Sequence, residues 1–245
     1  MNVKTAALAA LLMTGPAAAE EASIDYALSI AGLEIGDIGL NLAQIGDRYA
    51  LDLDGGFQFL FFGGRAEGRV EGARVDGRFE PADYRLYFEG PTRDVETRIS
   101  FADGAPQDWR VTPEPTAEMM EGRTPLPADA LAGAVDMISA FLISAQTAGE
   151  ACSQALKVFS GFVRFDVTLS PGAPPADGVA ACKVGYEPIA GHKLDENGEP
   201  RVIAGEDLSI SLFELTPNVW APHRVGFRTP VGTLAFERRA GAQTD

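Results

Sequence analysis

Residues 126–148 read LPADALAGAVDMISAFLISAQTA, and they form the one long stretch after the N-terminus with helical rather than alternating periodicity. Apolar residues recur there at the spacing of a single helical face, at Leu131, Val135, Ile138, Leu142 and Ala145. Pro127 suits a first helical turn, where its missing N–H costs nothing, and Gly149 suits a helix end. The pattern predicts one long helix over about 127–148 with a buried apolar face.

Segments with alternating apolar and polar residues lie on both sides of this helix. The first three run over 24–30, 38–42 and 49–53, and the last three over 159–169, 208–213 and 225–236, the last of which is expected to form a hairpin. Such alternation is typical of strands with one buried face. Asp136 and Ser139 fall mostly off the helical stripe, so the stripe is the part that the strands bury. We expect a mainly β protein, a curved antiparallel sheet forming an open barrel or β-spiral, with one long helix packed against it.

Length and composition fit a single domain. The chain has 245 residues, of which 46% are hydrophobic, with 27 Gly and 16 Pro, and this suits one β-rich domain with a sizeable core. Prolines are frequent in residues 112–127, which predicts a Pro-rich connection with little regular structure before the helix. We expect the β-barrel-like domain to span residues 20–245.

The N-terminus has the pattern of a signal peptide over residues 1–19. Lys4 gives a positive start, residues 6–13 are apolar, and Ala17 to Ala19 form a small-residue cleavage motif. The apolar run is too short to span a bilayer, and no later run approaches that length. No Cys follows the cleavage motif, so a lipid anchor is not expected. The sequence predicts a soluble protein exported to the periplasm, which is not an integral membrane protein.

The charge balance is strongly acidic. Without residues 1–19, which include Lys4, the chain holds 19 Lys and Arg against 35 Asp and Glu, a net charge of −16. Such a chain is not expected to bind nucleic acid, because the phosphates repel it. The same balance disfavours docking to an anionic membrane surface. Solubility is the simplest consequence of this charge.

Two cysteines in an exported protein predict a disulfide between Cys152 and Cys182. Closing a loop of about 30 residues is worth roughly 3.5 kcal/mol when it restricts the unfolded chain. The chain has no Cys-x-x-Cys motif, so a redox-active pair is not favoured.

Catalytic and metal-binding patterns are scarce. His192 and His223 are the two histidines, and the chain has neither a Gly-x-Ser-x-Gly elbow nor a His-x-x-x-His spacing for zinc. The acidic run 195–199 lacks the register of a calcium loop and fits an Asn-Gly hairpin turn. No Gly-rich phosphate loop is present. The sequence therefore predicts no catalytic residues, no metal and no cofactor, and it favours a protein that is not an enzyme.

One run differs from the other strands because it is apolar on both faces. Residues 57–64, FQFLFFGG, are expected either to be buried on both sides or to line a site. In the next strand small residues share one face, which lets the helix or a ligand come close. The candidate hydrophobic cavity is lined by Phe57, Phe59, Phe61, Gly68, Val70, Ile138 and Phe141. A packed core is the alternative for the same aromatic and apolar residues.

Short motifs of another kind are spread over nearly the whole mature chain. They are Tyr26…Gly32…Gly36, Gly77-Arg78-Phe79-Glu80-Pro81 with Tyr84, the helix near Leu131, Gly161…Arg164-Phe165-Asp166, Cys182…Tyr186-Glu187-Pro188-Ile189-Ala190-Gly191, and Pro222…Arg224…Thr229…Gly232. On these motifs the chain resembles the exported domain-of-unknown-function family 3108 of Gram-negative bacteria. The resemblance implies an architecture similar to the unclosed β-barrels of periplasmic lipoprotein carriers and to β-spiral envelope-integrity proteins. None of the motifs is a catalytic signature.

Three hypotheses of function follow. The first is a non-enzymatic periplasmic protein that supports the cell envelope and holds a hydrophobic ligand or acyl chain, from a lipid or a lipoprotein, in the concavity of the sheet. The second is a scaffold with a filled interior that binds another envelope protein. The third and least favoured is an envelope hydrolase, which needs a Ser or an acid beside His192 or His223 in a cleft.

Overall fold

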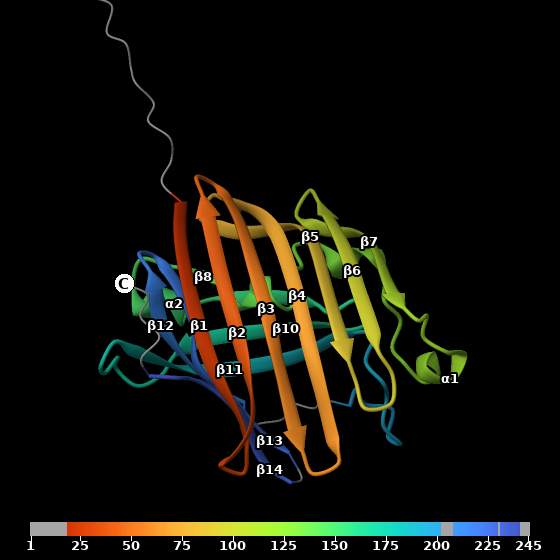
Figure 1. Ribbon diagram of the computed structural model, residues 1–245. Helices are drawn as coiled ribbons and strands as arrows, with labels where there is room; N and C mark the ends of the chain where they lie inside the picture. The colour runs from red at the N-terminus through yellow and green to blue at the C-terminus, as the bar shows by residue number, and fades with distance from the viewer. Residues whose placement is uncertain (1–18, 202–207, 230, 241–245) are drawn as a thin grey trace, which may run out of the picture.

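The computed structural model describes residues 19–201, 208–229 and 231–240, so nearly all of the predicted signal peptide, 1–19, lies outside the described residues. The first half of the described chain is a meander of antiparallel strands (Figure 1). Its strands are β1 (Ala19–Ile30), β2 (Leu33–Ile45), β3 (Arg48–Phe59), β4 (Phe62–Val75), β5 (Arg78–Glu89), β6 (Val95–Ala102) and β7 (Ala105–Thr112). The mainly β prediction is confirmed, and the first three predicted strands lie within β1, β2 and β3.

The second half forms another meander in the same sheet. Its strands are β9 (Ala155–Phe159), β10 (Arg164–Pro171), β11 (Val179–Ala190), β12 (Ser209–Thr216), β13 (Val219–Thr229) and β14 (Gly232–Arg238). β14 pairs with β1, from Tyr26 opposite Arg238 to Ile30 opposite Leu234. This pairing joins both meanders into one 14-stranded sheet, which runs in order from β7 through β1 and β14 to β9.

The sheet curves so that its two halves face each other. In Figure 1 the first meander runs steeply across β10 and β11, which lie behind it. Leu40 and Leu51 of the first meander belong to the same buried cluster as Phe213 and Val219 of the second. The main core therefore lies between the two halves, on the concave side.

The two edge strands approach each other without pairing. Trp109 of β7 and Phe159 of β9 have ring centroids 5.3 Å apart in an edge-to-face contact. Within the described ranges, no hydrogen-bonded ladder joins β7 to β9. The large antiparallel sheet is therefore curved and open.

The prediction of one long helix over 127–148 is wrong. The chain forms short elements in its place: the 3-10 helices η1 (Ala128–Leu131) and η2 (Ser139–Phe141), the strand β8 (Ile143–Ser144) and the helix α2 (Ala148–Ala151). We call residues 126–145 the crossing segment, because its apolar side chains pack against strands from both halves of the sheet. β8 adds to the sheet by pairing with β13.

Backbone hydrogen bonds explain why the crossing segment is not a helix. The N–H of Val135 donates to the carbonyl of Lys157, and the N–H of Phe159 donates to the carbonyl of Val135, both at 2.8 Å. The edge strand β9 thus binds the backbone groups that a helix would pair internally. Gly133, at φ +73°, turns the chain just before this contact.

The apolar stripe is still buried except at Val135, which is half-buried. Leu131, Ile138 and Leu142 lie in the main core, each with an exposed fraction under 5%. Asp136 and Ser139, which the helical pattern places off the stripe, are buried as well, at 0% and 2%. Contact with the sheet, rather than position around a helix axis, decides which side chains of this segment are buried.

The Pro-rich connection before the crossing segment holds one short helix, α1 (Ala117–Met120). Further along, the N–H of Thr124 donates to the carbonyl of His192 at 2.8 Å, and the N–H of Gly191 donates to the carbonyl of Thr124 at 3.2 Å. The connection is thus fastened to the chain that follows β11. In the part of the chain that the structure describes, no helix has the length and apolar character needed to cross a bilayer.

Candidate functional site

Three of the predicted cavity residues lie together on the concave side of β4. A Cβ atom added to Gly68 would lie 2.5 Å from Cδ1 of Ile138 and 3.1 Å from Cδ1 of Leu86. Val70 is fully buried and belongs to the same core cluster as Ile138. The crossing segment therefore occupies the space that the small residues of β4 leave open.

Phe141 lies in an aromatic group beside this contact. Its ring stacks on Phe236 of β14 with centroids 5.5 Å apart, and Tyr26 of β1 meets it edge-on at 6.5 Å. The Tyr26 hydroxyl donates to the carbonyl of Pro222 at 2.8 Å, and burial raises the pKa of this phenol. The aromatic side chains thus join η2 to β1 and β14, and the Tyr26 hydroxyl adds a hydrogen bond to β13.

Phe57, Phe59 and Phe61 lie apart from the main core, at the end of β3 and in the turn to β4. Phe59 pairs with Phe62 across a two-residue turn. Phe61 is 94% exposed, and its neighbours Leu60 and Phe62 are 73% and 59% exposed. Of the two alternatives expected for this run, burial on both sides is wrong for Leu60, Phe61 and Phe62, because the chain reverses there and leaves them at a hairpin tip.

A buried polar group, which sequence reasoning missed, lies between the crossing segment and the sheet. Oδ1 of Asp136 accepts hydrogen bonds from the N–H groups of Ile138 and Ser139, both at 2.8 Å, and the Ser139 hydroxyl lies 3.0 Å from that of Tyr49. Burial raises the pKa of Asp136, although the hydrogen bonds from Ser139 and Ile138 oppose this shift. Within the described ranges, Oδ2 of Asp136 and the buried hydroxyl of Tyr84 have no hydrogen-bond partner. An acid inside an apolar run is the only signal of this group in the sequence.

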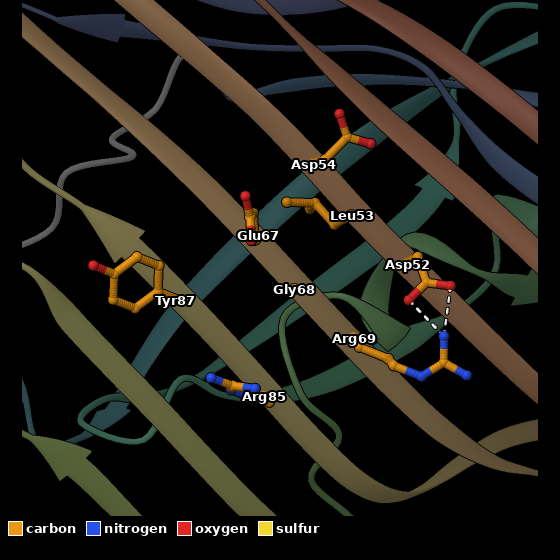
Figure 2. A pocket seen from close by; sticks show the side chains of 8 residues that line it. All are labelled: Asp52, Leu53, Asp54, Glu67, Gly68, Arg69, Arg85 and Tyr87. Atoms are coloured by element: carbon orange, nitrogen blue, oxygen red, sulfur yellow. Dashed lines mark hydrogen bonds and ion pairs between the residues drawn. The ribbon is translucent and has the colours of Figure 1, made fainter.

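An open depression of about 470 Å³ lies on the outer face of β3, β4 and β5 (Figure 2). Its lining consists of Asp52, Leu53, Asp54, Glu67, Gly68, Arg69, Arg85 and Tyr87. Figure 2 shows charged side chains from neighbouring strands standing around Gly68, which contributes no side chain to the floor. The depression is therefore polar at its rim and shallow where the glycine lies.

Ion pairs engage the arginines of this depression. Nη1 of Arg69 lies 2.7 Å from both carboxylate oxygens of Asp52, as Figure 2 shows, and Nε of Arg85 lies 2.5 Å from Oε1 of Glu96. Hydrogen bonds from Arg98 and Arg85 lower the pKa of Glu96. Exposed pairs of this kind contribute little to stability. Among the described residues, no group of His, Cys, Asp and Glu is arranged to hold a metal ion.

The two histidines occupy different surroundings. His192 is buried, its Nε2 donates to the carbonyl of Arg164 at 3.1 Å, and its ring meets Tyr186 edge-on at 6.4 Å. Burial lowers the pKa of His192. Arg164 is buried too and donates to the carbonyl of Ala130 at 3.0 Å, which holds η1 against β10. His223 lies on β13 and is half-buried.

Cys152 and Cys182 lie at disulfide distance, with Cα atoms 5.3 Å apart. Both belong to a second, smaller core cluster with Trp220, whose indole N–H donates to the carbonyl of Ala145 at 3.1 Å. This pair connects the end of α2 with β11, and the indole connects β13 with the end of the crossing segment.

Family membership has no support beyond the motifs themselves. Comparisons with protein-family models, with curated proteins and with solved structures found no match for this chain. The resemblance to domain-of-unknown-function family 3108 therefore stays a prediction, and the functional proposal rests on the geometry of this molecule.

Proposed function

We propose that the protein is an exported, non-enzymatic component of the cell envelope that binds its partner through its outer surface. The observation that carries the proposal is the position of Ile138, which occupies the space beside Gly68 on the concave side of the sheet. A sheet whose concavity is filled by its own chain has its binding surface outside. The scaffold hypothesis is therefore favoured over an acyl chain held in the interior.

The periplasmic location and the membership of family 3108 are part of the same proposal. The signal-peptide pattern over 1–19 supports a periplasmic location. The motifs around Gly77 and between Cys182 and Gly191 support membership of the exported family 3108. His192 contacts a backbone carbonyl and an aromatic ring rather than a nucleophile or an acid, which supports a role without catalysis.

Gly68→Leu tests whether the interior is filled. The new side chain would meet Ile138 and Leu86, so we expect the free energy of unfolding to fall by about 1–3 kcal/mol through overpacking. Gly185→Leu is the matched control, because Gly185 also lies within a strand, but the atoms nearest to its added Cβ belong to Thr168 and lie at ordinary contact distances from 3.7 Å. Urea denaturation of both variants measures the difference.

Lipid analysis gives the second arm of the same test. Organic extraction of protein purified from its native periplasm is expected to yield no stoichiometric lipid, and a fluorescent fatty acid is expected not to bind. If the wild type binds lipid and Gly68→Leu displaces it without loss of stability, the interior is a ligand cavity and the proposal fails.

A further inference from the structure

The hairpin tip between β3 and β4 exposes three consecutive apolar side chains. Leu60, Phe61 and Phe62 all stand in solvent, Phe61 almost completely. The run around them, residues 57–64, contains no charged residue. Groups of large apolar side chains left exposed in this way mark interaction sites on soluble proteins, because their burial against a partner is favourable.

The backbone of this turn is unfavourable for its residues. Leu60 has φ +54°, a conformation that glycine, asparagine and aspartate adopt more readily than leucine. Two other hairpins of the same meander place Asp-Gly at their turns, Asp76-Gly77 and Asp103-Gly104. Asp76 and Asp103 have similar values, φ +49° and +53°, so the β3–β4 turn departs from the other two in residue type and polarity. A bulky residue held in this conformation is typical of functional positions.

Three more turns lie at the same end of the sheet as this tip, and one of them, β5–β6, contains the charged residues Arg93 and Asp94. The turns β1–β2, β3–β4 and β13–β14 all lie at the bottom of Figure 1. The first and last of them touch, because a Cβ on Gly232 would lie 2.6 Å from Cβ of Ala31. Leu33 and Val231, beside these turns, are 62% and 64% exposed. We define the apolar end of the molecule as Leu33, Leu60, Phe61, Phe62 and Val231.

The opposite end of the first meander differs in charge. Its turns contain the carboxylates of Asp47, Asp76 and Asp103. Ile45 is 60% exposed there, but it is followed closely by the Asp47 carboxylate. The β1–β2, β3–β4 and β13–β14 turns contain no charged residue, although Glu34 follows Leu33 directly and the chain has a formal net charge of −15. The apolar end thus consists of uncharged turn tips on an acidic protein, and the carboxylate of Glu34 beside them is paired with Arg239.

Side chains satisfy turn carbonyls at the apolar end. Nε2 of Gln58 donates to the carbonyl of Leu60 at 3.0 Å, and Oγ1 of Thr229 donates to the carbonyl of Gly232 at 2.6 Å. A carbonyl oxygen that stays in water needs no hydrogen-bond donor from the protein, because water molecules donate to it. An unpaired carbonyl moved into an apolar medium costs free energy. These bonds therefore lower the cost of moving the turns out of water.

We propose that the apolar end inserts into the surface of a lipid bilayer with electrically neutral headgroups. The proposal rests on the proposed function, since it takes the membrane surface, rather than another envelope protein, as the partner that the exported protein binds from outside. Side chains that project from separate turn tips form no groove for a peptide, whereas the fluid acyl boundary of a bilayer accepts each of them independently. The acidic net charge opposes anionic headgroups, so apolar burial rather than charge attraction drives the insertion.

Flotation of the exported protein with vesicles of phosphatidylcholine and phosphatidylethanolamine tests the proposal. The wild type is expected to float, and Phe61→Ser is expected to lower the partition coefficient at least about ten-fold, since burying a Phe side chain contributes that much or more. Ile45→Ser, an exposed apolar position at the opposite end, is the matched control and should leave partitioning unchanged. Both variants should keep the thermal stability of the wild type.

Two further measurements separate apolar insertion from other modes of binding. Adding salt is expected to leave the partition coefficient unchanged, and adding phosphatidylglycerol is expected to lower it. Phe61→Trp should shift its emission to the blue when vesicles are added, because the indole leaves water, whereas Ile45→Trp should not.

A wild type that fails to float, or that floats no better than Phe61→Ser, overturns the proposal. So does self-association in solution that Phe61→Ser abolishes while vesicles remain unbound, because the partner is then a second copy of the chain. Neither outcome concerns the filled interior, which Gly68→Leu tests, so the two proposals can fail separately.

Discussion

Asp136 is a fully buried carboxyl group that shapes the crossing segment. Its Oδ1 holds the N–H groups of Ile138 and Ser139, and its burial raises its pKa above the ordinary value of 3.8. The folded protein therefore binds this proton more readily than the unfolded chain. It follows that the free energy of unfolding decreases as pH rises from the unfolded pKa through the folded pKa.

Asp136→Asn should remove this contribution to the pH dependence. The amide keeps an oxygen for the two N–H groups and stays neutral at every pH. We compare the free energy of unfolding of the variant with that of the wild type at a pH below 3.8 and at neutral pH. The difference, variant minus wild type, should be larger at neutral pH, because only the wild type loses stability through this group as the pH rises. Urea denaturation at both pH values measures this change, with Asp129→Asn at an exposed position of the same segment as the control. An equal difference from the wild type at both pH values would contradict the argument.

At the scale of elements, the crossing segment shows that side-chain burial can be predicted correctly when the secondary structure is not. Its three- and four-residue spacing correctly predicts that Leu131, Ile138 and Leu142 face the core. The same spacing is compatible with an irregular segment that makes short 3-10 turns. The helix prediction is wrong because β9 pairs with the backbone of Val135, and the sequence pattern contains no trace of that distant partner.

The cysteine pair also acts at the scale of elements, since it joins α2 to β11. Cys182→Ser should lower the free energy of unfolding by roughly 3.5 kcal/mol, because a cross-link over about 30 residues no longer restricts the unfolded chain. Cys152→Ser and the double variant should cost the same, since either change removes the same link. Alkylation without reductant should label neither thiol in the folded wild type. Two labelled thiols, with stability unchanged in Cys182→Ser, would refute this prediction.

At the scale of the whole molecule, the pairing of β1 with β14 decides the shape. It brings the first and last strands of the described chain together and makes two local meanders into one curved sheet. The edges of this sheet then meet at Trp109 and Phe159. The concavity that results is what the crossing segment fills.

The prediction of export concerns the whole chain. The cleavage motif that ends at Ala19 predicts a periplasmic product that begins at Glu20. Intact mass spectrometry of the periplasmic fraction measures this directly. A cytoplasmic product that retains Met1 would contradict both the location and the role in the envelope.

The sequence by itself determined the class of fold, an antiparallel β protein, and the burial of the stripe through Leu131 and Ile138. Both follow from spacing along the chain, because a side chain's face depends on its near neighbours in sequence. Only the tertiary structure decided that the stripe is not a helix, that Ile138 fills the space at Gly68, and that Phe61 stands exposed at a hairpin tip. These outcomes depend on which distant residues supply hydrogen bonds or cover a surface, and spacing along the chain carries no information about such partners.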